Sequence, residues 1–231
     1  MDSRRAAILD TIGVDRFVAR RPIGAAAAAA AEASAARAAA DPRSAMDWEA
    51  LAQEVATCTR CALSATRTRT VFGVGDHAAR WFVVGEAPGA DEDRQGEPFV
   101  GRAGQLLNSM LRAVGLPREQ VFIANVLKCR PPGNRDPSPE EVRCCIPFLH
   151  RQLALVDPAL ILCVGRIAAQ NLLATDTPIG KLRGAVHTLA PFKAPVVVTY
   201  HPAYLLRSPG EKRKVWEDLK FAMGVARGHG A

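Results

Sequence analysis

Four short apolar runs occur along the chain after residue 80, and each is bounded by turn-forming residues. They are WFVVG (81–85), VFIANVL (121–127), LILCVG (160–165) and VVVTY (196–200). The runs are continuous rather than alternating and are rich in β-branched residues, which is typical of strands buried on both faces of a parallel sheet. The pattern therefore predicts four buried strands.

Stretches with helical spacing of apolar residues separate these runs. Ser138, Pro139 and Glu141 form the N-cap, N1 and N3 positions of a capping box, and Gly115 provides a C-terminal stop. We expect helices at 47–57 (with Asp47 as N-cap), 104–115, 138–156, 165–173 and 211–226. Alternation of strands and helices predicts an α/β fold, a three-layer α/β/α sandwich with a central, mostly parallel four-stranded sheet.

The first 45 residues differ in composition from the rest of the chain. Residues 24–40 are almost pure alanine, which favours helix but provides no apolar stripe for docking. We therefore expect 1–45 to be a flexible or weakly helical tail, with a partner-binding helix as the alternative. The compact domain is expected over 46–231.

Composition and charge narrow the class of protein. Apolar residues make up 48% of the chain, no apolar run could span a bilayer, and the N-terminus lacks a signal-peptide core. We therefore expect a cytoplasmic protein with no membrane partner, whose thiols stay reduced. The net charge of +7 is compatible with a nucleic-acid partner, and equally with a basic solubility surface.

Four cysteines are spaced as in a metal centre. Cys58 and Cys61 form a C-x2-C pair, and Cys129 and Cys145 can close a tetrahedral set once the fold brings them together. Four thiolates suit zinc and iron–sulfur clusters alike. Cys144 is adjacent to the set, and Cys163 lies within an apolar strand, where a small core residue is expected.

Several motifs occur together with these cysteines. They are GEAPGADEDRQGEPFVGRAGQLL (85–107), NVLKCRPPGNR (125–135) and HPAYLLR (201–207). In this order and spacing, over about residues 47–225, the chain resembles a family-4 uracil-DNA glycosylase, the iron–sulfur branch of that superfamily. The resemblance implies a [4Fe–4S] cluster on Cys58, Cys61, Cys129 and Cys145, with zinc as the alternative.

The resemblance also assigns a uracil pocket beyond the carboxyl ends of the strands. Phe99 is expected to stack on a flipped-out uracil, and Asn125 to pair with its Watson–Crick edge. Gly85 and Ala87 let the backbone approach the ligand closely. His201 is expected to stabilise negative charge on the departing base.

The remaining implied roles concern water and DNA. Glu86 and Asn134 are expected to position water or the sugar, with a lesser role for Glu92. The reaction implied is hydrolysis without a covalent lysine intermediate. Leu205 and Leu206 are expected to enter the minor groove, with a Leu-Leu pair in the core as the alternative, and Arg207 to meet phosphates or the groove. Lys128, Arg130 and Arg135 are expected to contact DNA.

The resulting hypothesis is a monomeric DNA-repair hydrolase that excises uracil from single- and double-stranded DNA. A non-catalytic uracil- or nucleic-acid-binding module on the same fold is the main alternative. A zinc or redox protein that uses C-x2-C for thiol exchange is a third. It would place the pair at the N-terminus of a helix after a strand, whereas here the pair follows a predicted helix.

Overall fold

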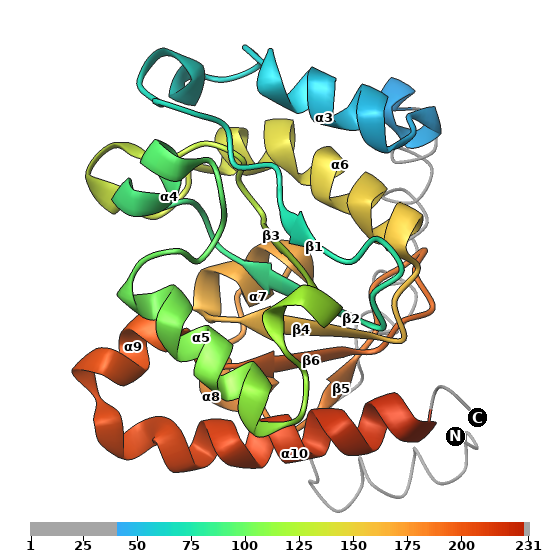
Figure 1. Ribbon diagram of the computed structural model, residues 1–231, viewed down its shortest axis with the longest axis vertical. Helices are drawn as coiled ribbons and strands as arrows, with labels where there is room; N and C mark the ends of the chain where they lie inside the picture. Colours follow the sequence, from blue (N-terminus) through green and yellow to red (C-terminus); the bar gives the residue numbers. More distant parts are fainter. Residues whose placement is uncertain (1–40, 229–231) are drawn as a thin grey trace, which may run out of the picture. The chain divides into compact units, whose positions relative to one another are not determined.

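The computed structural model describes residues 41–228 (Figure 1). The predicted tail up to residue 40 lies outside these residues. Residues 41–45, assigned to the tail above, include the short 3-10 helix η1 (Pro42–Ala45). Arg43 is buried there, with its guanidinium donating to the main-chain oxygen of Cys144 (3.0 Å) and lying over the ring of Phe148. The packed domain therefore includes Asp41 to Ala45.

The central sheet has six strands, rather than the four predicted. Its order is β1-β3-β2-β4-β6-β5; the four middle strands are parallel and the two outer ones antiparallel. The middle four correspond to the four apolar runs. The outer two have only two residues each and are not buried, so no apolar run marks them in the sequence. The bounds are β1 Val74–Gly75, β2 Trp81–Gly85, β3 Phe122–Asn125, β4 Leu160–Val164, β5 Val186–His187 and β6 Val196–Thr199.

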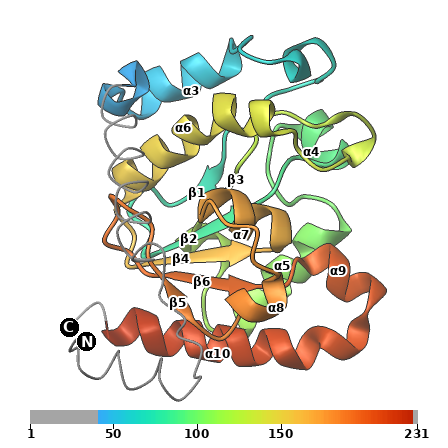
Figure 2. The ribbon, with the colours of Figure 1, turned by 180° about the vertical axis from the view of Figure 1, so that it is seen from behind.

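Helices cover both faces of the sheet, as expected for a three-layer sandwich (Figures 1 and 2). Helices α3, α6 and α7 pack with one face, and α5 and α10 with the other. The longer helices are α3 Trp48–Ala56, α5 Arg102–Ala113, α6 Pro139–Val156, α7 Arg166–Leu172 and α10 Lys212–Gly228. The shorter ones are α4 Ala90–Gln95, α8 Ile179–Leu182 and α9 Pro202–Arg207, and the 3-10 turns are η2 Ala62–Ala65, η3 Arg118–Gln120, η4 Pro132–Asn134 and η5 Pro209–Glu211.

The helix starts follow the predicted capping chemistry. The Asp47 side chain accepts from the backbone N–H of Ala50 (2.9 Å) at the start of α3. Ser138 and Glu141 form the reciprocal capping box of α6. Side chains at these positions satisfy backbone N–H groups that have no partner within the helix. The caps fix where α3 and α6 begin, and hence where the cysteines on and after them lie.

Alternate residues of each middle strand feed two apolar cores. Phe82 and Val84 of β2 point to the α3/α6 side, whereas Trp81 and Val83 point to the α5/α10 side. Burial on both faces explains why the runs are continuously apolar. Among the helices of residues 41–228, none combines the length and apolar character required to cross a membrane.

Candidate functional site

The predicted uracil-binding residues meet at the carboxyl ends of the parallel strands. Gly85 ends β2 and Asn125 ends β3, and the two are paired in register. Gly165 follows β4, and His201 lies just beyond β6. A side chain at Gly165 would come within 3.0 Å of the His201 Cβ. Adjacent strand ends thus bring together residues that are more than a hundred positions apart in sequence.

Asn125 carries an acceptor without a partner in this site. Its side chain is 2% exposed, and its Oδ1 has no hydrogen-bond donor in the structure. Buried amide oxygens are nearly always paired, so an unpaired one is suited to accept from a ligand. A Cβ on Gly85 would lie only 2.3 Å from this oxygen, so glycine keeps the space beside it open.

Phe99 forms one wall of the same site. Its ring edge would lie 2.6 Å from a Cβ on Gly85, and its ring centroid is 5.7 Å from that of His201. Phe99 has a φ of 55°, in the left-handed region that non-glycine residues rarely adopt. Ala87 lies nearby in sequence, half-buried and packed against the core on the α6 side. The structure therefore brings Gly85, Phe99, Asn125 and His201 together.

His201 is both a helix cap and a candidate hydrogen-bond donor. Its Nδ1 accepts from the backbone N–H of Ala203 (3.1 Å) at the start of α9. Burial, aided by the charge of Arg207, lowers the pKa of His201 to about 4. The imidazole is therefore neutral at pH 7, and with Nδ1 acting as acceptor the ring proton resides on Nε2. A neutral imidazole can still donate from Nε2.

Glu86 is a half-buried carboxyl group next to this site. Burial, with repulsion from Asp136 as a smaller cause, raises the pKa of Glu86 to about 7, against an opposing effect of Arg166. Arg166 and Asp136 form an ion pair at 2.8 Å. A carboxyl group with a pKa near neutrality can exchange a proton with water under physiological conditions.

Asn134 and Glu92 make contacts that differ from those of Glu86. Asn134 is exposed, and its Oδ1 accepts from Arg130 Nε (2.8 Å); none of its described contacts joins it to Glu86 or His201. The carboxylate of Glu92 accepts from the backbone N–H groups of Gly89, Val100 and Gly101. The oxygens of Glu92 are therefore engaged in holding loops.

The predicted minor-groove residues divide between core and surface. Leu205 is 1% exposed and packs in the α5/α10 core, so its assignment to DNA was wrong. Leu206 is 38% exposed and Arg207 is exposed as well. Adjacent residues on a helix point about 100° apart, and here Leu205 points into the core while Leu206 points outward.

The predicted DNA contact by Lys128 was also wrong. Lys128 is 1% exposed, and its Nζ donates to Gln152 Oε1 (2.6 Å) and to the main-chain oxygen of Asn125 (3.0 Å). Arg130 is half-buried. Arg135 is exposed but forms two hydrogen bonds with the buried carboxylate of Glu141, at 2.6 and 2.9 Å. The basic residues of this loop therefore have partly structural roles.

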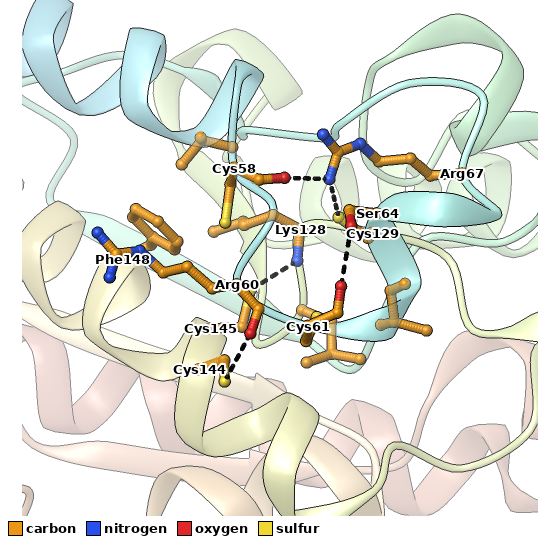
Figure 3. Close-up of a pocket in the computed structure, with 13 residues that line it drawn as sticks. Cys58, Arg60, Cys61, Ser64, Arg67, Lys128, Cys129, Cys144, Cys145 and Phe148 are labelled. Carbon is orange, nitrogen blue, oxygen red and sulfur yellow. Dashed lines mark hydrogen bonds between the residues drawn. The ribbon is translucent and has the colours of Figure 1, made fainter.

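The four predicted cysteine ligands line a single cavity (Figure 3). Cys58 and Cys61 follow α3, Cys129 follows β3 and Cys145 lies in α6; Cys144 lines the same cavity. None of the six cysteines forms a disulfide bond. Within residues 41–228, no three Cys, His, Asp or Glu side chains form a ready-made group for one metal ion. The structure thus has a thiol-lined cavity.

Two of the sulfur atoms in this cavity accept hydrogen bonds. Arg67 donates to the main-chain oxygen of Cys58 (2.7 Å) and to Cys129 Sγ (3.3 Å), and the backbone N–H of Lys128 donates to Cys145 Sγ (3.1 Å). N–H donors and a guanidinium stabilise thiolates and the negative charge of a thiolate-bound metal. Arg67 was not among the residues predicted from the sequence. Its position six residues after Cys61 was the only available signal.

The chain is similar to known proteins over most of its length. Residues 72–220 match the Uracil DNA glycosylase superfamily. A type-4 uracil-DNA glycosylase of Archaeoglobus fulgidus is 47% identical over 176 residues, which cover 74% of this chain and 88% of the relative. Those of Sulfurisphaera tokodaii (41%; 74% of this chain, 81% of the relative) and Thermotoga maritima (41%; 79% and 96%) are also similar. The chain therefore belongs to the uracil-DNA glycosylase superfamily, in its type-4 branch.

Proposed function

We propose that this protein hydrolyses the N-glycosidic bond of uracil in single- and double-stranded DNA, releasing uracil and leaving an abasic site. One observation carries the proposal: an aromatic ring, an unpaired buried amide oxygen and a neutral imidazole converge at the strand ends. They are Phe99, Asn125 and His201. The relatives named as uracil-DNA glycosylases support the same function.

Asn125 can recognise the base by its hydrogen-bonding pattern. Its Oδ1 lacks a donor, and uracil offers the N3–H group as one, while the amide nitrogen can donate to uracil O4. Cytosine has an acceptor and a donor in the reverse positions, so it would leave the amide mismatched. Stacking on Phe99 would bind the flat face of the extruded base.

His201 is suited to stabilise the leaving group. As the bond to C1′ breaks, negative charge develops on uracil O2, and a donor held at that point stabilises the transition state more than the ground state. The N-cap bond to Ala203 fixes the ring and leaves Nε2–H as donor. Because the base departs as an anion, His201 need not be protonated at the start.

Water attack requires a group near the sugar. Glu86, with a pKa of about 7, is the carboxyl group beside the strand ends that can orient water or stabilise positive charge at C1′. Asn134 belongs to this proposal as a second water-positioning group. Lys128 is tied to Gln152 and Asn125, which supports hydrolysis rather than covalent attack by this lysine.

The thiol-lined cavity fits a tetrathiolate cofactor. We propose that Cys58, Cys61, Cys129 and Cys145 hold a [4Fe–4S] cluster, with zinc as the alternative. Thiols from three separate segments, with Arg67 and a backbone N–H directed at sulfur, support this assignment. Bound there, the group would serve structurally, tying the 129–145 loop to the segment after α3.

DNA contact is proposed through Leu206, Arg207, Arg130 and Arg135. Leu206 is one of the few exposed large apolar side chains of the described residues. Arg207 ends α9 beyond β6, and Arg130 and Arg135 lie in the segment between β3 and α6. Action as a monomer is part of the same proposal.

The decisive test is alkaline cleavage of an oligonucleotide with one uracil after incubation with the purified protein. A thymine oligonucleotide and an Asn125→Ala, His201→Ala double variant serve as controls. Cleavage at uracil alone, lost in the variant, is expected. If metal-replete protein binds uracil-containing DNA without cleavage, the binding-module alternative replaces the enzyme. Iron, sulfide and zinc analysis of the same protein decides the cofactor.

A further inference from the structure

The backbone at Phe99 adopts a conformation that needs support from its surroundings. Its φ of 55° lies in the left-handed region, where a bulky side chain is disfavoured. The ring is nevertheless 7% exposed and directed toward Gly85 and His201. Other groups must therefore hold the peptide units on both sides of this residue.

Glu92 holds the peptide units that follow Phe99. Its Oε1 accepts from the backbone N–H groups of Val100 (3.0 Å) and Gly101 (3.1 Å), while Oε2 accepts from that of Gly89 (3.1 Å). One carboxylate thus joins the loop after β2 to the loop that carries Phe99. Hydrogen bonds to an ionised acceptor are stronger than neutral ones, so this link is firm.

Arg118 holds the peptide unit before Phe99 and also the carbonyl of the peptide unit after it. Its Nη2 donates to the main-chain oxygen of Pro98 (2.6 Å), and its Nη1 to that of Phe99 (3.3 Å) and to Asn108 Oδ1 (3.3 Å). Gly104 allows this arrangement, because a Cβ there would lie 1.8 Å from the Phe99 oxygen. An acidic and a basic side chain thus fasten the N–H and C=O groups around one residue.

We propose that Glu92 and Arg118 are positioning residues that hold the Phe99 ring in place against the base. This inference rests on the proposed function, because it assumes that Phe99 stacks on uracil. It gives Glu92 a role different from the positioning of water or sugar expected from the sequence. The two residues act through the backbone of Phe99 and touch no reacting atom.

The test compares base affinity with DNA affinity in Glu92→Ala, Glu92→Gln and Arg118→Met. Loss of the hydrogen bonds from Glu92 or Arg118 to the backbone around Phe99 is expected to weaken inhibition by free uracil and to slow single-turnover excision, each by about tenfold. Affinity for DNA with an abasic site, which offers no base to stack, should change less than about twofold. Glu92→Gln retains a carbonyl acceptor and should recover part of the loss. Glu49→Gln, an exposed carboxylate in α3 with no described contact to Arg118 or Phe99, is the control.

A double-mutant cycle with Phe99→Ala separates positioning from a general loss of structure. In the Phe99→Ala background, Glu92→Ala should slow excision by less than about twofold more, since the ring it positions is gone. Multiplicative effects, or a parallel loss of abasic-DNA affinity, would overturn the inference while wild-type excision stands. Wild-type protein that neither excises nor binds uracil would overturn the proposed function, and this inference with it.

Discussion

Lys128 Nζ donates a hydrogen bond of 3.0 Å to the main-chain oxygen of Asn125, from a position fully inside the core. The backbone N–H of the same lysine donates to Cys145 Sγ (3.1 Å). One residue therefore contacts both the cysteine-lined cavity and the residue proposed to read the base. The two sites share a structural element rather than lying in separate parts of the fold.

Replacing this lysine should affect stability. Lys128→Met leaves the oxygens of Asn125 and Gln152 without their donor, which is expected to cost about 1–3 kcal/mol per unsatisfied buried group, offset in part by removal of a buried charge. Denaturant unfolding of metal-replete protein measures the net loss. Lys181→Met, at an exposed position, should leave stability unchanged. Equal stability of both variants would contradict a structural role for Lys128.

His201 can be tested by separating its two roles. His201→Asn keeps a good N-cap for α9, whereas His201→Ala removes the cap at a cost of about 1 kcal/mol. Both variants should slow excision by about 10²–10³-fold, since both lose the Nε2 donor. Thermal unfolding measures the loss of the helix cap, and single-turnover kinetics measure the loss of the Nε2 donor. An active asparagine variant would show that the imidazole is dispensable for leaving-group departure.

Because the pKa of Glu86 is raised, the stability of the protein should depend on pH in a predictable way. Its pKa is about 7 in the folded state against 4.5 as the ordinary value, so ionisation opposes folding; the penalty grows as pH rises from about 4.5 to about 7 and is fully present above that. Glu86→Gln should therefore be more stable than wild type at pH 8.5, by about 1–2 kcal/mol after allowance for solvent screening. Little gain is expected at pH 4. Unfolding curves at both pH values decide the matter, and a uniform gain would indicate another cause.

Leu205 and Leu206 offer a matched pair for the DNA contact. Leu206→Ala removes an exposed side chain and should slow excision from duplex DNA by about tenfold, with single-stranded DNA affected far less. Leu205→Ala instead leaves a cavity in the core and should destabilise the protein by about 2–5 kcal/mol. Comparison of duplex and single-stranded rates with unfolding free energies separates the two. Equal slowing on both DNA forms by Leu206→Ala would argue against insertion into the groove.

Cys144 and Cys145 test the metal assignment in the same way. Both line the cavity, but Cys145 Sγ accepts from the Lys128 N–H, whereas Cys144 Sγ donates to the main-chain oxygen of Arg60 (3.4 Å). Cys145→Ser should lose bound iron because a hydroxyl is a poorer ligand than a thiolate. Cys144→Ser should retain it. The iron and sulfide content of each purified variant gives the answer, and reversed results would exchange their roles.

The sequence predicted the parts of the fold that depend on continuous patterns. The four middle strands and their helices follow from apolar runs and capping residues such as Asp47 and Ser138, which act locally. Strands β1 and β5 were missed because two-residue pairings depend on distant partners. Lys128 and Leu205 were misassigned because residue type alone does not reveal burial. Lys128 lies in a basic loop, but its side chain points inward and donates to Gln152. The link from Glu92 to Val100 likewise became visible only once the two loops were placed side by side.

The two short outer strands have a consequence for behaviour at high concentration. An open parallel sheet presents unpaired N–H and C=O groups that can recruit a strand from another molecule and start aggregation. Here each flank ends in an antiparallel strand of only two residues, and β1 is bordered by Gly73 and ends at Gly75, both with positive φ. Such a border gives an incoming chain little backbone to pair with. The aggregation-prone middle strands are thereby shielded in a crowded solution.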